Sequence, residues 1–451
     1  MDHPASVEIG KKKAALRKAV GQTTESKYPE GMTRHQYHNA VAMFCLAIVM
    51  YFVVNIQRVA VPGQIFDALQ AELGLSASAV SAMGTAFMYV YAATQLAVGL
   101  LVDKYGGMRV LATGSILMAI GAILFPLADN YWLLVAGRVL VGLGCGATFL
   151  SVVKEMDRLF PQRFALVMGV AILIGYIGAT IGTMPLAKAS QAWGWRPCMM
   201  AVGVLGAVAL IAIGALWRFT TRPKVTSMPL TLKPFKIGFS NRYGLIQLFS
   251  YTINYGIYFA ILTVFGKKFL EDAGHLSSNV ASLTSATMML LPAIANQVVG
   301  VLTTCAGNRR RPFFRLLNLF PLVSTLLILI CLLGHFKGFG YGLIVAFILI
   351  SLVGGFTPVT SSLSRETNPP EYTGTAVGII NFGAYIMTAI GGTISGLVLD
   401  WYGGTPMPNG AISYPDKAYI TIFAFFALIS LGTFLISLKM PETYGKNIYK
   451  N

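Results

Sequence analysis

The sequence predicts an all-α membrane protein with twelve transmembrane helices in two parallel six-helix halves, and three observations support this fold class. Hydrophobic residues make up 55% of the 451 residues and charged residues 11%, which is too apolar for a soluble protein of this length. Twelve apolar segments are long enough to span a bilayer. Stretches of the first half of the chain also recur in the second half.

Each apolar segment reaches the roughly 20 residues that a helix needs to cross the hydrocarbon layer. The predicted spans run near residues 39–61, 79–101, 110–128, 131–153, 164–187, 197–217, 243–266, 279–303, 313–334, 339–362, 375–399 and 418–438.

Basic residues are concentrated on one side of these spans. Of the 34 Lys and Arg, 26 fall in the two tails and the even-numbered loops, and six fall in the odd-numbered loops. The positive-inside rule therefore predicts that both termini are cytoplasmic, and we expect a multi-pass protein of the bacterial inner membrane. This asymmetry accounts for the net charge of +17. Because the basic runs carry no interleaved aromatic side chains, we expect no nucleic-acid partner.

Internal repeats predict the domain organisation. Residues 75–81 resemble residues 276–282, and residues 99–109 resemble residues 300–310 at the same offset. A second match pairs Tyr176 with Tyr385. Parallel repeats of this kind place a transport site at their interface and operate by rocking of one half against the other. The expected domains are a basic cytoplasmic tail (1–38), an N-terminal bundle (39–218), a cytoplasmic linker (219–241), a C-terminal bundle (242–438) and a cytoplasmic tail (439–451).

The loop between the second and third segments carries the most specific motif. Its Gly99, Asp103, Gly106 and Arg109 match the pattern of the major facilitator superfamily, which the chain resembles over residues 39–438. We expect Gly99 to permit close helix approach and Gly106 to permit a tight turn. The resemblance implies that Asp103 latches the cytoplasmic side against the start of segment eleven, at residues 373–375; an ordinary cap in a turn is the alternative.

Two arginines, Arg58 and Arg138, lie within apolar segments without an acidic neighbour. A charge at bilayer depth is costly, so it usually faces a cavity and serves a function. Both positions are similar to arginines that bind the substrate carboxylate in the organic-anion symporters of the superfamily. The neighbouring positions where those relatives keep acids are Gln57 and Cys145. The alternatives are that Arg58 extends to the outer interface and that Arg138 ties neighbouring helices together through backbone carbonyls.

Uncharged polar residues complete the candidate substrate site, although each could instead connect helices. We expect the amides and tyrosines to set shape and hydrogen bonding around the two arginines. The candidates are Asn55, Tyr89, Gln95, Tyr176, Asn254, Tyr255, Tyr258, Asn381 and Tyr385. Of these, Asn254, Asn381, Tyr176 and Tyr385 are preferred.

No Asp, Glu or His lies deep in an apolar segment, so a proton relay of the usual kind is not visible. The coupling could be anion exchange, a sodium ion, or a proton carried by the substrate. We expect no catalytic residue, no metal and no cofactor, because neither a nucleophile with its base nor a metal-ligand cluster is visible.

The sequence therefore predicts a monomeric secondary transporter for a small organic anion, with a carboxylate as the leading expectation. The lipid bilayer, the substrate and a coupling ion or counter-substrate are the expected partners. The alternatives are an exporter of drugs or other amphipathic compounds, and uptake of a neutral or zwitterionic nutrient. An embedded enzyme is disfavoured by the polar inventory.

Overall fold

A computed structural model describes residues 32–160, 163–217, 241–334, 338–369 and 373–449. Twelve helical spans among these residues are long and apolar enough to cross a membrane, which confirms the predicted fold class. Most of the predicted N-terminal tail and of the linker 219–241 lies outside the described residues.

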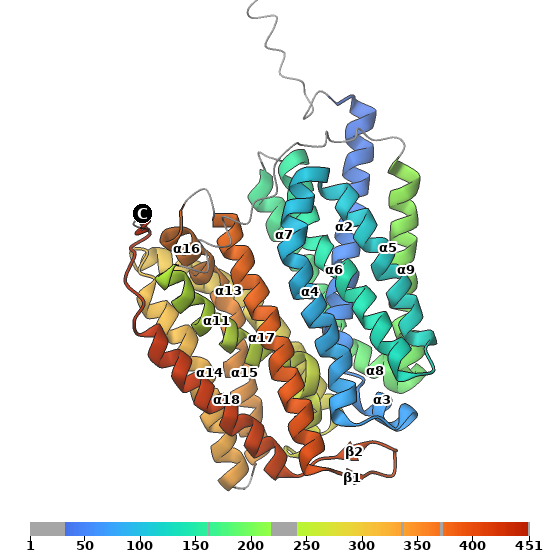
Figure 1. Cartoon of the computed structure of the whole chain (residues 1–451), viewed down its shortest axis with the longest axis vertical. Coiled ribbons are helices and arrows are strands. Elements are labelled where there is room, and N and C mark those ends of the chain that lie inside the picture. Colours follow the sequence, from blue (N-terminus) through green and yellow to red (C-terminus); the bar gives the residue numbers. More distant parts are fainter. Residues whose placement is uncertain (1–31, 161–162, 218–240, 335–337, 370–372, 450–451) are drawn as a thin grey trace, which may run out of the picture.

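The first half of the chain forms one helical bundle, drawn in blue to green in Figure 1. Its helices are α2 (Arg34–Ala60), α3 (Phe66–Leu73), α4 (Ala77–Tyr105), α5 (Gly107–Leu127), α6 (Tyr131–Leu159), α7 (Phe164–Ile181), α8 (Met184–Trp193) and α9 (Trp195–Trp217).

The second half forms the other bundle, drawn in yellow-green to red. Its elements are α11 (Arg242–Ala260), the π-helix η3 (Ile261–Phe265), α12 (Gly266–Asp272), α13 (Ser278–Cys305), α14 (Arg311–Gly334), α15 (Phe339–Ser351), the 3₁₀-helix η4 (Leu352–Phe356), α16 (Thr357–Thr367), α17 (Thr373–Tyr402), the strands β1 (Thr405–Pro406) and β2 (Ile412–Ser413), and α18 (Asp416–Ser437).

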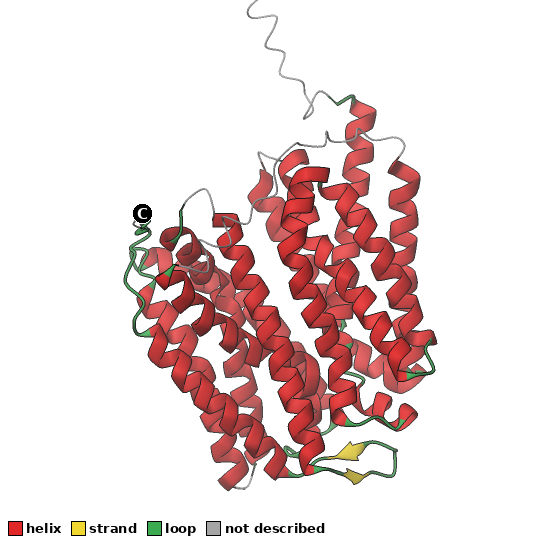
Figure 2. Cartoon of the chain, in the orientation of Figure 1, coloured by secondary structure: helices red, strands yellow, loops and turns green. Residues whose placement is uncertain are grey.

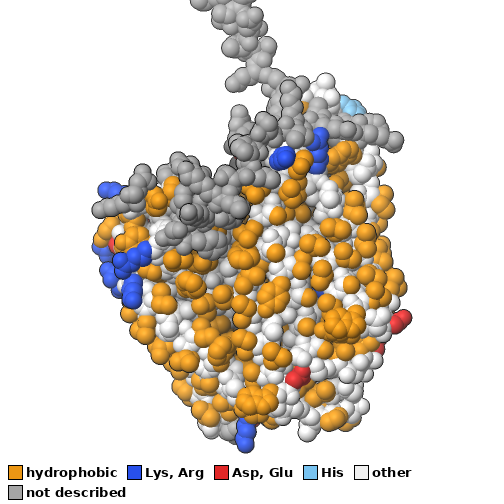
Figure 3. All heavy atoms as spheres, viewed as in Figure 1, with side chains coloured by type: hydrophobic (Ala, Val, Ile, Leu, Met, Phe, Trp, Pro, Cys, Tyr) orange, Lys and Arg blue, Asp and Glu red, His pale blue; other side chains and the backbone are white. Residues whose placement is uncertain are grey.

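The two bundles stand side by side with their helices roughly parallel (Figure 1). We call the end at which α2 begins and α18 ends the tail side, and the end with the β1–β2 hairpin the hairpin side. The two strands are the only sheet in the described chain, and helices account for nearly all the rest (Figure 2). Figure 3 shows the viewed face covered mainly by hydrophobic side chains, with Lys and Arg gathered towards the tail side.

Several predicted spans are broken rather than continuous. The span 164–187 divides into α7 and α8 around Gly182 and Thr183. Span seven passes through the π-helix η3, and span ten through the 3₁₀-helix η4. Hydropathy does not reveal such breaks because these segments remain apolar throughout, whereas irregular helical turns often occur at functional positions.

The motif loop between α4 and α5 matches its predictions only in part. Gly106 has a φ of 87°, a conformation that glycine adopts without strain, so the tight turn is confirmed. The expected close approach at Gly99 is wrong, because a Cβ there would meet no heavy atom within 4 Å. The side chains of Asp103 and of residues 373–374, at the start of α17, lie outside the described set, so the latch stays a prediction.

Buried carboxylates organise the tail side of each bundle. In the first half, Glu155 accepts a hydrogen bond from the Met108 backbone at 2.9 Å and pairs with Arg158 at 2.6 Å. In the second half, Glu366 pairs with Arg310 at 3.2 Å and accepts a 2.6 Å hydrogen bond from the Thr443 hydroxyl. The C-terminal segment is thereby fixed against α16.

We predict that Glu366→Gln destabilises the protein by about 3 kcal/mol, because it leaves the Arg310 guanidinium buried without its counter-charge. Thermal unfolding of the purified protein measures this. The control is Glu442→Gln, which keeps an acceptor for the backbone N–H groups of Arg310 and Arg311. Equal melting temperatures for both variants would show that the buried pair contributes little.

Candidate functional site

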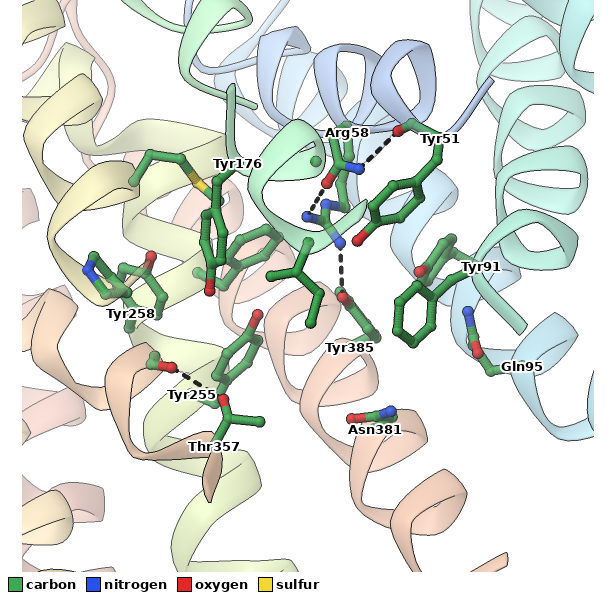
Figure 4. A pocket seen from close by; sticks show the side chains of 18 residues that line it. Tyr51, Arg58, Tyr91, Gln95, Tyr176, Tyr255, Tyr258, Thr357, Asn381 and Tyr385 are labelled. Carbon is green, nitrogen blue, oxygen red and sulfur yellow. Dashed lines mark hydrogen bonds between the residues drawn. The ribbon is translucent and has the colours of Figure 1, made fainter. Parts of the chain in front are cut away.

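A cavity of about 210 Å³ lies between the two bundles and is the candidate substrate site. Helices α2, α4, α6 and α7 of the first half and α11, α13, α16 and α17 of the second contribute to its wall, together with η4. Figure 4 shows Tyr51 and Tyr385 next to Arg58, with Tyr91, Tyr176 and Tyr255 around the same space.

Arg58 is the one charged side chain among the described residues that line this cavity. Its Nη1 donates to the Tyr385 hydroxyl at 2.9 Å, and its Nη2 donates to Asn55 Oδ1 at 2.6 Å (Figure 4). The guanidinium carbon lies 5.4 Å from the centre of the Phe259 ring, within cation–π range. Its buried Nε has no hydrogen-bond partner in the described protein. The Nε donor of Arg58 is therefore unsatisfied in this structure.

The segment that follows Arg58 prevents it from reaching the hairpin-side surface. Val59, Ala60 and Val61 have no exposed surface, and Ile65 and Phe66 are 2% exposed. The alternative in which Arg58 extends to the outer interface is therefore wrong. The helix end instead directs the guanidinium towards α17 of the opposite bundle.

Aromatic rings surround the guanidinium on both sides of the interface. Tyr385 makes an edge contact with Tyr91, with ring centres 4.6 Å apart, and Tyr255 stacks on Phe259 at 5.5 Å. Such rings combine an apolar face with a hydroxyl that can donate or accept a hydrogen bond. The cavity therefore offers one fixed positive charge inside a wall of neutral hydrogen-bonding groups.

Eight of the eleven residues predicted to bind substrate line this cavity. They come from both halves of the chain and include the repeat-related pair Tyr176 and Tyr385. The eight are Asn55, Arg58, Gln95, Tyr176, Tyr255, Tyr258, Asn381 and Tyr385. Their contact with a substrate stays a prediction.

Arg138 does not line the cavity, which corrects its predicted place beside the substrate. It is completely buried, and its guanidinium donates to the backbone carbonyls of Gln57 at 3.1 Å, Val61 at 3.4 Å and Met83 at 3.5 Å. Its guanidinium carbon also lies 4.5 Å from the centre of the Phe87 ring. The structural alternative holds: Arg138 ties α6 to α4 and to the end of α2 that carries Arg58.

Asn254 and Tyr89 also lie outside the cavity. Asn254 is fully buried and donates to Asn318 at 2.8 Å and to Thr433 at 2.9 Å, so it joins α11 to α14 and α18. Tyr89 is 37% exposed and its hydroxyl lies 3.4 Å from that of Thr393 on α17. Both predictions failed because a polar residue in an apolar helix can point to several neighbours, and sequence does not select one.

Several lining residues were not among the predicted site residues. The set is mainly aromatic and apolar and comprises Tyr51, Tyr91, Phe149, Ile172, Gly175, Phe259, Met289, Pro292, Gly354 and Thr357. Helical spacing could have identified part of it. Tyr51 and Asn55 precede Arg58 by seven and three residues, and therefore share its helix face. Phe259 likewise follows Tyr255 by four.

We predict that Arg138→Met lowers the free energy of unfolding by about 2 kcal/mol, because it removes the buried hydrogen bonds that tie α6 to α4 and to the end of α2. Chemical or thermal denaturation of the purified variant measures this loss. Ligand binding in the cavity should persist in whatever folded protein remains, because Arg138 does not line it. An Arg138→Met variant of normal stability that no longer binds anions would return this residue to the substrate site.

Comparisons with known proteins agree with this architecture. The Major Facilitator Superfamily profile matches residues 43–267 and again residues 244–450. The solved structure titled "peptide transporter POT in complex with sulfate" superposes with a TM-score of 0.71 at 14% identity, covering 93% of this chain and 96% of that one.

Two curated relatives are similar over shorter stretches. The "Probable sulfoacetate transporter SauU" of Cupriavidus necator is 30% identical over 38% of this chain and 39% of its own. The "Probable anion transporter 3, chloroplastic" of Arabidopsis thaliana is 26% identical over 50% of this chain and 45% of its own. Each match thus spans less than half of the relative. With both halves matched by the family profile, the chain belongs to the Major Facilitator Superfamily.

Proposed function

We propose that this transporter moves a small organic anion, with a carboxylate as the leading substrate class, by alternating access between the two bundles. The observation that carries the proposal is Arg58: one guanidinium with an unpartnered Nε, in a cavity without a described acidic lining residue. A guanidinium binds carboxylates and related oxyanions through paired, charge-assisted hydrogen bonds. The relatives named for sulfoacetate and anion transport support this class of cargo.

The surroundings of Arg58 favour an anion over a cation or a neutral compound. Its two hydrogen bonds go to a tyrosine hydroxyl and an amide oxygen, both neutral, so the positive charge is not cancelled. An incoming carboxylate would supply the missing negative charge. A cationic drug would meet repulsion from the guanidinium without an acid to offset it.

In this proposal, the coupling of substrate transport to an ion or a counter-substrate does not require an acid beside Arg58. The two positions at which related symporters keep acids are Gln57 and Cys145, both buried and both outside the described cavity wall. Exchange for another anion, sodium symport and a proton carried on the substrate remain the candidate modes. Vesicle uptake with imposed proton or sodium gradients distinguishes them.

Contacts between the bundles on the hairpin side support the alternating-access mechanism. Lys268 of α12 pairs with Asp67 of α3 at 2.8 Å across the interface. Asp400 of α17 accepts hydrogen bonds from the backbone N–H groups of Ala77 and Ser78, at the positive end of α4. The ribbons of the two bundles diverge towards the tail side (Figure 1). We infer a state closed on the hairpin side, and the positive-inside rule predicts that this side faces away from the cytoplasm.

We predict that purified protein is stabilised against heat by one or more organic anions and less by their neutral amides. Arg58→Gln should weaken this binding by about tenfold to a hundredfold, the value of a charge-assisted hydrogen bond, while the melting temperature without ligand changes little. Arg58→Lys should retain part of the affinity because it keeps the charge.

The screen compares carboxylates, sulfonates and phosphate with amino acids, sugars and amphipathic amines, followed by uptake into vesicles. If sugars or amines bind and are transported equally well by Arg58→Gln, the neutral-nutrient or drug-export alternative replaces the anion proposal.

We predict that Asp67→Asn raises the fraction of protein open on the hairpin side by roughly fivefold, because an ion pair worth about 1 kcal/mol is lost across the interface. The readout is labelling of Thr357→Cys, a cavity position, in a background with the native cysteines replaced. A membrane-impermeant maleimide added only on the hairpin side of sealed vesicles reports this opening.

The matched control is Glu271→Gln, which removes a charge from the same cluster. Glu271 pairs with Lys267 at 3.2 Å on the same helix, so its loss does not cross the interface. Equal labelling of the two variants would contradict a role for the Asp67–Lys268 pair in closing the hairpin side.

A further inference from the structure

A second cavity, of about 490 Å³, lies outside the substrate site, between α4 and α5 with α6 beneath. The tight turn at Gly106 joins α4 and α5 at the tail side. Beyond that turn the wall is mainly apolar, with Val98 and Leu101 on α4, Leu117 on α5, and Leu143 on α6. We call this cavity the α4–α5 groove.

The groove is open to the region that lipid occupies in a membrane. Leu101 and Leu143 are 38% and 36% exposed, although they lie within membrane-spanning helices. α4 and α5 both contribute to the largely hydrophobic face seen in Figure 3, and Figure 1 shows α6 between them. An apolar channel in this position suits an acyl chain.

Arg109 lies at the tail-side end of the groove, together with Tyr105. It occupies the first turn of α5, where the helix dipole favours an anion and disfavours a cation. The first turn of α5 contains no acid. Within the part of the chain that the structure describes, no carboxylate pairs with the Arg109 side chain. The mouth of the groove therefore presents the positive charge of the Arg109 guanidinium, whereas the Met108 N–H at the start of α5 is already bound by Glu155.

The sequence repeat shows that this arrangement differs between the halves. The counterpart of Arg109 is Arg310, which is 7% exposed and donates to Glu366 from Nε at 3.3 Å and from Nη2 at 3.2 Å. In the first half, Glu155 is the buried acid at the tail-side end of α6. It pairs with Arg158 and accepts a hydrogen bond from the Met108 backbone, so it does not pair with Arg109. The second half supplies its arginine with a protein anion, whereas Arg109 lines the groove and has no such partner among the described side chains of the first half.

We propose that the α4–α5 groove binds an anionic phospholipid, with an acyl chain along its apolar wall and the phosphate on Arg109. Basic pockets between membrane helices bind lipid headgroups in this way. The phosphate takes the place that Glu366 fills beside Arg310. This inference is independent of the substrate, because the groove shares no residue with the wall of the central cavity.

Native mass spectrometry of the full chain tests the proposal. The purified protein is incubated with equal amounts of phosphatidylglycerol and phosphatidylcholine. The number of lipid molecules of each kind that stay bound when the protein is released from the detergent micelle is then measured. The wild type should retain phosphatidylglycerol preferentially. Arg109→Gln should lower that retention about fivefold, the value of one basic residue near an anionic headgroup, and Arg109→Lys should restore most of it.

Two matched controls separate the groove from general surface charge and general lipid contact. Arg309→Gln removes an exposed basic residue from the corresponding loop of the second half and should leave retention unchanged. Thr113→Phe places a ring in the groove and should lower phosphatidylglycerol retention. Ile116→Phe adds a ring three residues further along α5, at a 49% exposed position outside the groove, and should not.

Three results would overturn the proposal. One is equal retention of the two lipids by the wild type. Another is the same phosphatidylglycerol retention by Arg109→Gln and Arg309→Gln. The third is complete displacement of phosphatidylglycerol by inorganic phosphate, which would show that the acyl chain contributes nothing. Intact melting temperatures of the variants exclude misfolding as the cause of lost lipid.

Discussion

The cost of holding a guanidinium inside a membrane-spanning bundle is the constraint on which the site depends. Two arginines, Arg138 and Arg58, lie inside the bundles, and they are stabilised in different ways. Arg138 is fully buried and directed to three backbone carbonyls, so its hydrogen bonds hold helices together. Arg58 faces a cavity, has two neutral partners and keeps one donor unpartnered. The first arginine is structurally satisfied, whereas the second is completed by an anion in our proposal.

The two arginines are also linked. Two of the carbonyls bound by Arg138 belong to Gln57 and Val61, on either side of Arg58 in sequence. Arg138 therefore fixes the helix end from which Arg58 extends, while Tyr385 receives Arg58 from the opposite bundle. Because Tyr385 belongs to α17, any rocking of the bundles changes the surroundings of the guanidinium. Binding of an anion and movement of the halves would thereby be coupled through one side chain.

The sequence predicted the long apolar spans well, because twenty consecutive apolar residues have few other structures available in a membrane. It predicted the site less completely. Arg58 and Arg138 both lie in apolar segments without an acidic neighbour, and only the packing of α2, α4 and α6 decides that Arg138 meets carbonyls. Tyr51 and Phe259 were not selected because aromatic residues in apolar helices usually pack against neighbours. The short helix α3 and the breaks at η3 and η4 leave no clear hydropathy signal.

The central claim is that the charge of Arg58 selects an anion. The most direct measurement is calorimetric titration of the purified protein with the best-bound carboxylate and with its amide, in the wild type and in Arg58→Gln. We expect the wild type to prefer the carboxylate by at least about tenfold, and the variant to lose this preference because the charge-assisted hydrogen bonds are gone. The same preference in both proteins would contradict the account and assign anion recognition to another part of the molecule.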